Sequence, residues 1–221
     1  MKNIIMTIMV GLFLIGTACS ANAEVLLPGA LNVAPSGAAA PAGTYVTSIT
    51  DPFTGTDITN TVYYTGTLTE TVLKNTTGML FEFSFSNNIS SKDAIAQLAT
   101  LNYSGYTVSA DALMVGGQAG TPSVNGMDRS NGNGDVVTFG WLDNPVNPGQ
   151  SSGNFWIQTN APSYQNGSTQ LLGAGIASTS TDGPAGFVPS ETPLATPEPA
   201  TMSLLGMGLI GLVKARRQRS V

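Results

Sequence analysis

The sequence predicts an all-β protein, an antiparallel β-sandwich with one short helix, lying between two apolar terminal segments. Runs of alternating apolar and polar residues support this, because a period of two turns one face of each strand toward a core. Glycine, asparagine and proline clusters separate the runs, as the turns of antiparallel folds require. Charged residues make up only 10% of the 221 residues, whereas 26 are glycine. A β-barrel is the alternative architecture.

The clearest strand is expected at residues 79–86, where Phe81, Phe83 and Phe85 alternate with Glu82 and other residues that point the opposite way. Threonine, valine and tyrosine, which favour strands, are frequent in the remaining runs. The predicted strands span residues 44–50, 61–73, 79–86, 106–115, 135–142, 154–159 and 170–178.

Turn-forming sequences delimit these strands. Residues 74–78 (Lys-Asn-Thr-Thr-Gly) indicate a hairpin connection between two of them. The pair Asp51-Pro52 is expected to end the first strand, because proline cannot donate to a sheet ladder. Asn166-Gly167 is expected to form a turn ahead of the last strand.

The one helix is predicted over about ten residues between the strands. Ser91 is a candidate N-cap and Asp93 lies in the expected first turn, where a carboxylate is favourable. The apolar stripe of this helix would comprise Ala94, Ile95, Leu98 and Leu101.

The chain divides into five parts by composition. A signal peptide is expected at residues 1–23, an extended leader rich in Ala, Pro and Gly at 24–42, and the β-sandwich domain at 43–187. A proline-containing linker without periodicity follows at 188–196, and residues 197–221 form the C-terminal tail.

The N-terminus has the three parts of a secretory signal peptide. Lys2 supplies the positive charge, residues 4–15 form an apolar stretch, and Ala21 and Ala23 provide the small-x-small cleavage pattern. The apolar stretch is too short for a spanning helix, which needs roughly 20 residues. Lipidation at Cys19 is the alternative, although the residues before it lack the leucine that a lipobox prefers.

The C-terminus combines three features in order. Pro197, Glu198 and Pro199 are followed by an apolar stretch at 202–213 and a basic cluster at 214–219. This arrangement closely resembles the PEP-CTERM sorting signal, a tail that is also described as an ice-binding protein C-terminal region. The resemblance implies that an exosortase, a membrane cysteine protease-transpeptidase, recognises the Pro-Glu-Pro motif and cleaves near it. It makes this chain a substrate and implies no activity of its own.

The two ends together predict an exported protein. We expect passage through the Sec translocon and transient inner-membrane insertion of a hydrophobic sorting helix through 202–213, with the basic cluster on the cytoplasmic side. The final location would be the outer surface or the extracellular space. Without the signal peptide and the residues after Pro199, three basic residues remain against thirteen acidic ones, a net charge of −10. Such a body would be repelled by phosphate backbones, so nucleic-acid binding is not expected.

The composition excludes several kinds of catalysis. The chain contains no histidine, and its single cysteine, Cys19, lies in the expected signal peptide, so Ser/His/Asp and Cys/His nucleophile arrangements cannot form. A carboxylate pair remains conceivable, with Glu70 and Glu82 on neighbouring strands. Both occupy ordinary positions of alternating strands, where exposure to solvent is the simpler interpretation. We therefore expect no enzyme and no cofactor.

A calcium site is one binding hypothesis. Asp128, Asn131, Asn133 and Asp135 lie in a short segment rich in the oxygen ligands that Ca²⁺ prefers. The segment lacks the spacing of an EF-hand, and a polar hairpin explains it equally.

Two further patterns have alternative interpretations. Thr65, Thr67, Thr69 and Thr71 would align on one strand face, as an ice-binding surface needs, or simply face solvent. Phe155 with its two tryptophan neighbours would form a sugar-stacking platform or part of the core; the tryptophans are Trp141 and Trp156.

The resulting hypothesis is a structural or interaction protein of the envelope or of an exopolysaccharide matrix. The association with exopolysaccharide comes from the PEP-CTERM resemblance. The alternative is a glycan- or calcium-binding extracellular module.

Overall fold

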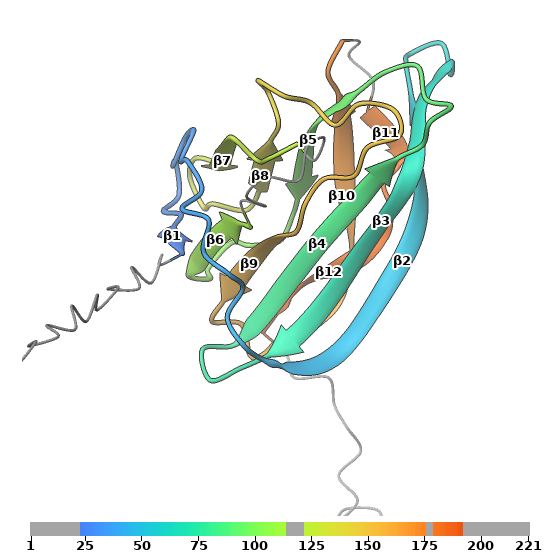
Figure 1. Cartoon of the computed structure of the whole chain (residues 1–221). Helices are drawn as coiled ribbons and strands as arrows, with labels where there is room; N and C mark the ends of the chain where they lie inside the picture. The colour runs from blue at the N-terminus through green and yellow to red at the C-terminus, as the bar shows by residue number, and fades with distance from the viewer. Residues whose placement is uncertain (1–22, 114–121, 176–178, 192–221) are drawn as a thin grey trace, which may run out of the picture.

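A computed structural model describes residues 23–113, 122–175 and 179–191, and this part of the chain is all-β, with no helix (Figure 1). It therefore contains no helix that is long and apolar enough to cross a membrane. The strands are β1 (Glu24–Val25), β2 (Thr44–Thr56), β3 (Val62–Lys74), β4 (Met79–Asn87), β5 (Ile95–Thr100), β6 (Val108–Ala112), β7 (Gly126–Arg129), β8 (Val137–Gly140), β9 (Phe155–Thr159), β10 (Ser163–Gly173), β11 (Thr179–Asp182) and β12 (Ala185–Ser190).

All the strands pair antiparallel along one continuous path, β1-β6-β9-β4-β3-β2-β11-β10-β5-β8-β7, with β12 beside β10. The path folds over, so that the sheet containing β9, β4, β3 and β2 faces the sheet containing β10, β5 and β8. Figure 1 shows β4, β3 and β2 side by side, with β10 and β12 behind them. The predicted all-β antiparallel architecture is confirmed.

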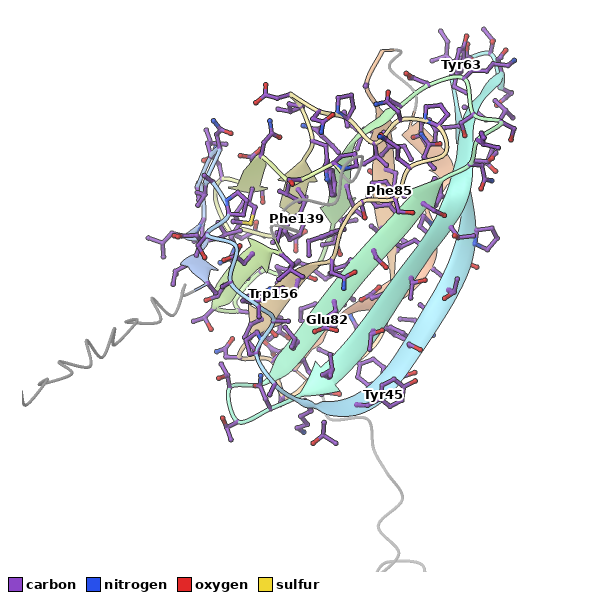
Figure 2. The ribbon with its side chains drawn as sticks, in the orientation of Figure 1. Tyr45, Tyr63, Glu82, Phe85, Phe139 and Trp156 are labelled. Carbon is purple, nitrogen blue, oxygen red and sulfur yellow. The ribbon has the colours of Figure 1, made fainter. Side chains whose placement is uncertain are left out.

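Aromatic side chains fill the space between the sheets. Phe155 of β9 packs on Phe139 of β8, with ring centroids 4.7 Å apart, and on Trp141 at 5.2 Å. Phe85 of β4 meets Trp141 edge-on at 5.1 Å, and Figure 2 shows Phe85 and Phe139 between the two sheets. The hydroxyl of Tyr64 adds a polar link by donating to the Leu171 carbonyl at 2.6 Å.

The N-terminal segment joins the two ends of the strand path. β1 pairs with β6, and residues 29–33 then run along the outer edge of β7. Val33 and Met127 exchange two backbone hydrogen bonds of 3.0 and 2.9 Å, and the Arg129 N–H donates to the Ala30 carbonyl at 2.8 Å. Because exposed strand edges invite pairing with other chains, this closure protects the edge of β7.

The same segment then crosses the outer face of β6, β9 and β4. The buried carboxylate of Asp111 accepts the N–H groups of Gly37 and Ala38 at 3.0 and 3.3 Å, and it also accepts the Ser36 hydroxyl. The Trp156 indole N–H donates to the Ala38 carbonyl at 3.2 Å. The segment 24–42, which composition sets apart as an extended leader, therefore packs on the domain with little regular structure of its own.

The strands with the strongest alternation match the prediction. β3 and β4 occupy the predicted positions within one residue, and the predicted hairpin at 74–78 is confirmed by the Asn75 N–H, which donates to the Gly78 carbonyl at 3.0 Å. β9 also matches. β7 and β12 lie where no strand was predicted, and β12 extends to Ser190, into the segment assigned to a linker.

The predicted helix is wrong, because residues 95–100 form β5. This strand pairs with β10 on one side and β8 on the other, and Ser91 bonds to the Thr65 backbone instead of capping a helix. The spacing of Ile95 and Leu98 suits a helix, but Ala96, Leu98 and Thr100 also alternate as a strand requires. A ten-residue helix is only marginally stable alone. As a strand between β10 and β8, the same segment has its backbone N–H and C=O groups hydrogen-bonded on both sides.

Two predicted turns are also wrong. β2 continues past Asp51-Pro52 to Thr56. At Pro52 this strand pairs only with β3, since β11 joins it from Thr54 onward. Proline is tolerated where a strand has a neighbour on one side only, because its missing N–H then breaks no hydrogen bond to a second strand. Asn166-Gly167 lies inside β10, paired with Phe187 and Gly186 of β12. Tertiary pairing therefore overrides local turn propensity at both places.

Arg129 ties three parts of this fold together. Arg129 is 3% exposed, and its guanidinium donates to backbone carbonyls from the N-terminal segment, the β5–β6 loop and the β7–β8 turn. The acceptors are Leu26 at 2.8 Å, Tyr103 at 2.8 Å, Tyr106 at 2.9 Å and Gly134 at 2.9 Å. Removing the side chain leaves these carbonyls without their charged donor.

We predict that Arg129→Met lowers the free energy of unfolding by at least about 1.5–3 kcal/mol, the usual contribution of a hydrogen bond to a charged group, because four carbonyls lose their donor. Arg129→Lys should remain strongly destabilised, because an ammonium offers three donors from one point and cannot span four carbonyls. Urea unfolding followed by tryptophan fluorescence measures both.

Lys74→Met is the matched control. The Lys74 side chain is exposed and donates to a single carbonyl, that of Pro162, at 3.2 Å, so its removal should change stability by less than about 0.5 kcal/mol. Equal losses in the Lys74 and Arg129 variants would contradict a special role for Arg129.

Candidate functional site

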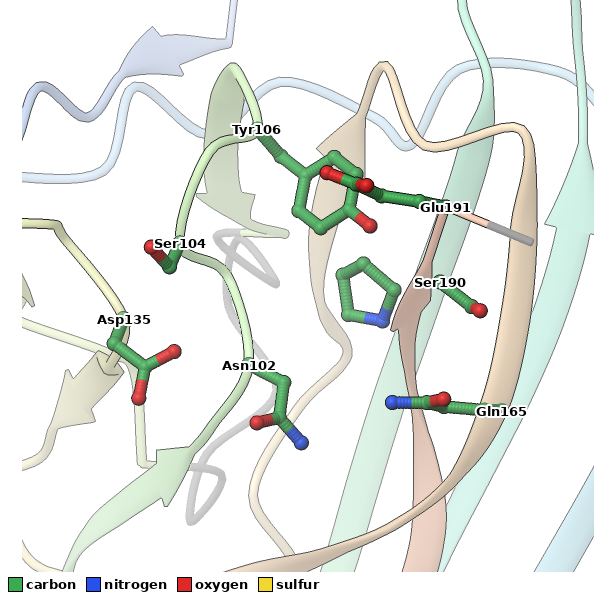
Figure 3. Close-up of a pocket in the computed structure, with 8 residues that line it drawn as sticks. Asn102, Ser104, Tyr106, Asp135, Gln165, Ser190 and Glu191 are labelled. Carbon is green, nitrogen blue, oxygen red and sulfur yellow. The ribbon is translucent and has the colours of Figure 1, made fainter.

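A polar groove of about 350 Å³ opens between the β5–β6 loop, the start of β8 and the end of β12. Figure 3 shows Tyr106 and Glu191 at one end, Asn102 and Gln165 at the other, and Ser104 with Asp135 on one wall. An aromatic ring, two amides, hydroxyls and carboxylates therefore converge on one open space. The lining residues are Asn102, Ser104, Tyr106, Asp135, Gln165, Pro189, Ser190 and Glu191.

The β5–β6 loop that carries Tyr106 is shaped by two residues with positive φ. Asn102 has φ 69° and Gly105 has φ 81°, a region that asparagine and glycine tolerate best. The Tyr103 N–H donates to the Asp135 carbonyl at 2.9 Å. The Arg129 guanidinium donates to the Tyr103 and Tyr106 carbonyls and so fixes the loop. The groove is thus built on fixed backbone, which favours a preformed binding site.

The groove carries negative charge. Asp135 and Glu191 supply carboxylates, and none of the lining side chains is basic. Partial burial raises the pKa of the Tyr106 phenol, and the charge of Glu191 raises it further. Tyr106 therefore remains a neutral phenol whose ring can stack and whose hydroxyl can donate.

The structure does not bring Glu70 and Glu82 together as a catalytic pair. They lie on neighbouring strands β3 and β4 but on opposite faces, since Glu70 pairs with Phe83 and Glu82 with Thr71. Glu82 points outward from β4 (Figure 2) and is partly exposed. Glu70 has no exposed surface, so the expectation that it faces solvent is wrong.

The Glu70 carboxyl group is buried inside the protein. Its Oε2 accepts the Phe187 N–H of β12 at 2.9 Å, whereas its Oε1 is buried with no hydrogen-bond partner. Burial raises the pKa of Glu70 to about 8, against the opposing effect of the Phe187 hydrogen bond. Burial and the Glu70 charge also raise the pKa of Tyr103.

The four residues proposed as calcium ligands do not share one site, because their side chains have different partners and exposure. Asp128 accepts the Asn32 N–H, and Asp135 lines the groove. The buried Arg129 guanidinium bonds the Gly134 carbonyl of the intervening turn and would repel a second cation. Asn131 and Asn133 are exposed in that turn. Within the described part of the chain, no three acidic, histidine or cysteine side chains come together to hold a metal ion.

The threonine row faces outward from β3, as predicted for a strand face. Thr69 pairs with Thr50 of β2 through hydroxyls 3.0 Å apart, and Thr67 with Ser86 of β4 at 2.9 Å. These bonds satisfy hydroxyls within the sheet.

The aromatic platform is not on the surface. Trp141 and Phe155 are fully buried between the sheets, and Trp156 is 2% exposed beneath Ala38. The interpretation of these three residues as core side chains is confirmed.

Sequence reasoning missed Tyr106 as a site residue, because it was assigned to the start of a predicted strand. The Asn-x-x-Gly-Tyr sequence at 102–106 was the available signal for an exposed loop aromatic. The sorting motif Pro197-Glu198-Pro199 and Ala21 of the cleavage pattern lie outside the described residues.

Comparison with known proteins bears on the C-terminal tail. A family model described as the PEP-CTERM protein-sorting motif matches residues 195–219, which confirms the resemblance. The match implies an exported protein that is sorted to the surface by an exosortase. No curated protein and no solved structure matches the chain.

We predict that Glu70 makes stability depend on pH. Its pKa is higher in the folded state than the usual 4.5, so the native protein retains a proton that the unfolded chain releases. The free energy of unfolding should therefore fall as the pH rises from about 4.5 to about 8, by at most about 1.4 kcal/mol per pH unit. Glu70→Gln should flatten this dependence and raise the Tm at pH 8 above that of the wild type.

Asp143→Asn is the control, because this carboxylate is exposed and accepts one side-chain hydrogen bond, from Asn125. Thermal melts between pH 4 and 9 compare the variants. Parallel curves for the Glu70 variant and the wild type would show that Glu70 does not cause the dependence.

Proposed function

We propose that the folded body is a non-catalytic carbohydrate-binding protein of the cell envelope or the exopolysaccharide matrix. The observation that carries this proposal is the open groove in which the partly exposed ring of Tyr106 lies among amides, hydroxyls and carboxylates. Sugars combine apolar ring faces with polar edges. Such a ligand matches an aromatic side chain that presents both an apolar body and polar neighbours.

Several observations support binding over catalysis. Glu70 and Glu82, the carboxylates that the sequence offered as a pair, lie on opposite faces of one sheet. The chain has no histidine and no cysteine after the expected signal peptide, so nucleophilic mechanisms that depend on them are excluded. The groove offers hydrogen-bonding groups on a rigid loop, which suits recognition.

The proposed route to the surface follows from the two ends. The signal peptide directs the chain to the Sec translocon, and residues 202–213 hold it briefly in the inner membrane. An exosortase then cleaves near Pro197-Glu198-Pro199 and releases the body to the surface or the matrix. The PEP-CTERM match at 195–219 supports this route.

We predict that the purified protein binds extracellular polysaccharide and that Tyr106→Ala weakens binding about tenfold, since lost stacking and contact area amount to roughly 1–1.5 kcal/mol. Tyr106→Phe should retain most of the affinity because the ring remains. Isothermal titration with matrix oligosaccharides measures the change.

Tyr45→Ala is the matched control, because this tyrosine is 62% exposed and lies on β2, at the lower end of the strand in Figure 2, outside the groove. Equal losses in the Tyr45 and Tyr106 variants would contradict the assignment of the groove. Hydrolysis of any ligand would contradict the non-catalytic role.

We predict that the mature protein begins at Glu24 and contains no peptide beyond Pro199. Mass spectrometry of the protein from the native cell surface or medium measures both ends. Replacing Pro197, Glu198 and Pro199 by alanine should leave the basic tail attached. A wild-type protein with its tail intact would indicate a simple membrane anchor.

A further inference from the structure

We propose that the Tyr106 groove selects an amino-sugar polymer that carries both free amines and N-acyl groups, and that it rejects anionic glycans. This inference rests on the proposed carbohydrate-binding function and names the class of ligand. Two features of the groove lead to it: the sign of its charge and a second, apolar groove on the other side of Tyr106.

The first feature is uncompensated negative charge. Asp135 and Glu191 line the groove at separate positions, one on the wall beside Ser104 and the other beside Tyr106 (Figure 3). Between residues 24 and 196 the chain has only three basic residues, and the one nearby, Arg129, has its guanidinium bound to four carbonyls. A uronate would therefore meet repulsion, whereas an ammonium group would find a partner.

The second feature is a neighbouring groove of about 310 Å³ that shares Tyr106 with the first. Its lining is mainly apolar, with Val25, Leu27, Pro28 and Val108, and it also includes Asn133 and the carbonyl-bound Arg129. Val25 and Leu27 are 64% and 68% exposed, so much of their apolar surface is open to water. A ligand that covers them gains by removing apolar surface from water.

The two grooves together require a ligand longer than one sugar. Tyr106 lies where they meet, so one sugar ring stacked on it places its neighbours over the carboxylates and over the apolar lining. Amines on one side and N-acyl methyl groups on the other satisfy both environments. A partly N-acetylated hexosamine chain has this combination of groups, and a neutral glucan has neither.

The test compares three oligosaccharides of equal length: partly N-acetylated glucosamine, a neutral glucan and a uronate. We expect the wild-type protein to bind the amino-sugar oligomer about tenfold more tightly than the glucan, with no measurable uronate binding. Raising the salt concentration should reduce this preference, because Asp135 is partly exposed and Glu191 is exposed, so salt screens both charges.

Variants separate the groove from the overall negative charge of the protein. The double variant Asp135→Asn, Glu191→Gln should lose the preference for amines and keep its affinity for the glucan. The control double variant Glu82→Gln, Asp143→Asn removes the same charge outside the groove and should retain the preference. An unchanged preference in the groove variant would overturn the inference, since attraction would then come from net charge alone.

The outcomes for this inference and for the proposed function differ. Equal wild-type affinity for the amino-sugar and neutral oligomers, lost in Tyr106→Ala, would overturn the amine selectivity and support the carbohydrate-binding groove. Absence of binding to all three classes would overturn both. Tight uronate binding would contradict the charge argument directly.

Discussion

The buried guanidinium of Arg129 is the interaction on which the rest of this fold depends. A charge that is removed from water must be compensated, and here four backbone carbonyls from three separate segments do so. The side chain thereby fixes where the N-terminal segment, the β5–β6 loop and the β7–β8 turn lie relative to one another. Because each of these segments lacks long strands, their positions rely on directed hydrogen bonds more than on sheet pairing.

The same interaction connects the closure of the sheet with the groove. Residues 29–33 run along the edge of β7, while Tyr106 and Asp135 flank the loop and turn that Arg129 holds. The groove is also bordered by Glu191, at the end of the described body, beyond which the chain continues toward the sorting motif. The proposed carbohydrate-binding groove therefore lies at the C-terminal end of the described body.

Buried polar groups perform the role that disulfides have in many exported proteins. The chain after the expected signal peptide contains no cysteine, and Arg129 and Asp111 each bind several backbone groups of distant segments. Glu70 contributes similarly at β12 but with an unpaired oxygen. A buried carboxyl group without full compensation favours its protonated form, so this contact is the one most sensitive to pH.

Some features followed from the sequence alone, because local patterns carry them. Alternation over 79–86 predicted β4 and its phenylalanine core face, and the three-part tail predicted the sorting signal that the family match confirms. Tertiary structure decided the rest. The spacing of Ile95 and Leu98 suits a helix, but hydrogen bonding to the neighbouring strands β10 and β8 makes this segment a strand. The burial of Glu70 and the Tyr106 groove likewise depend on contacts between residues far apart in the chain, which no local period encodes.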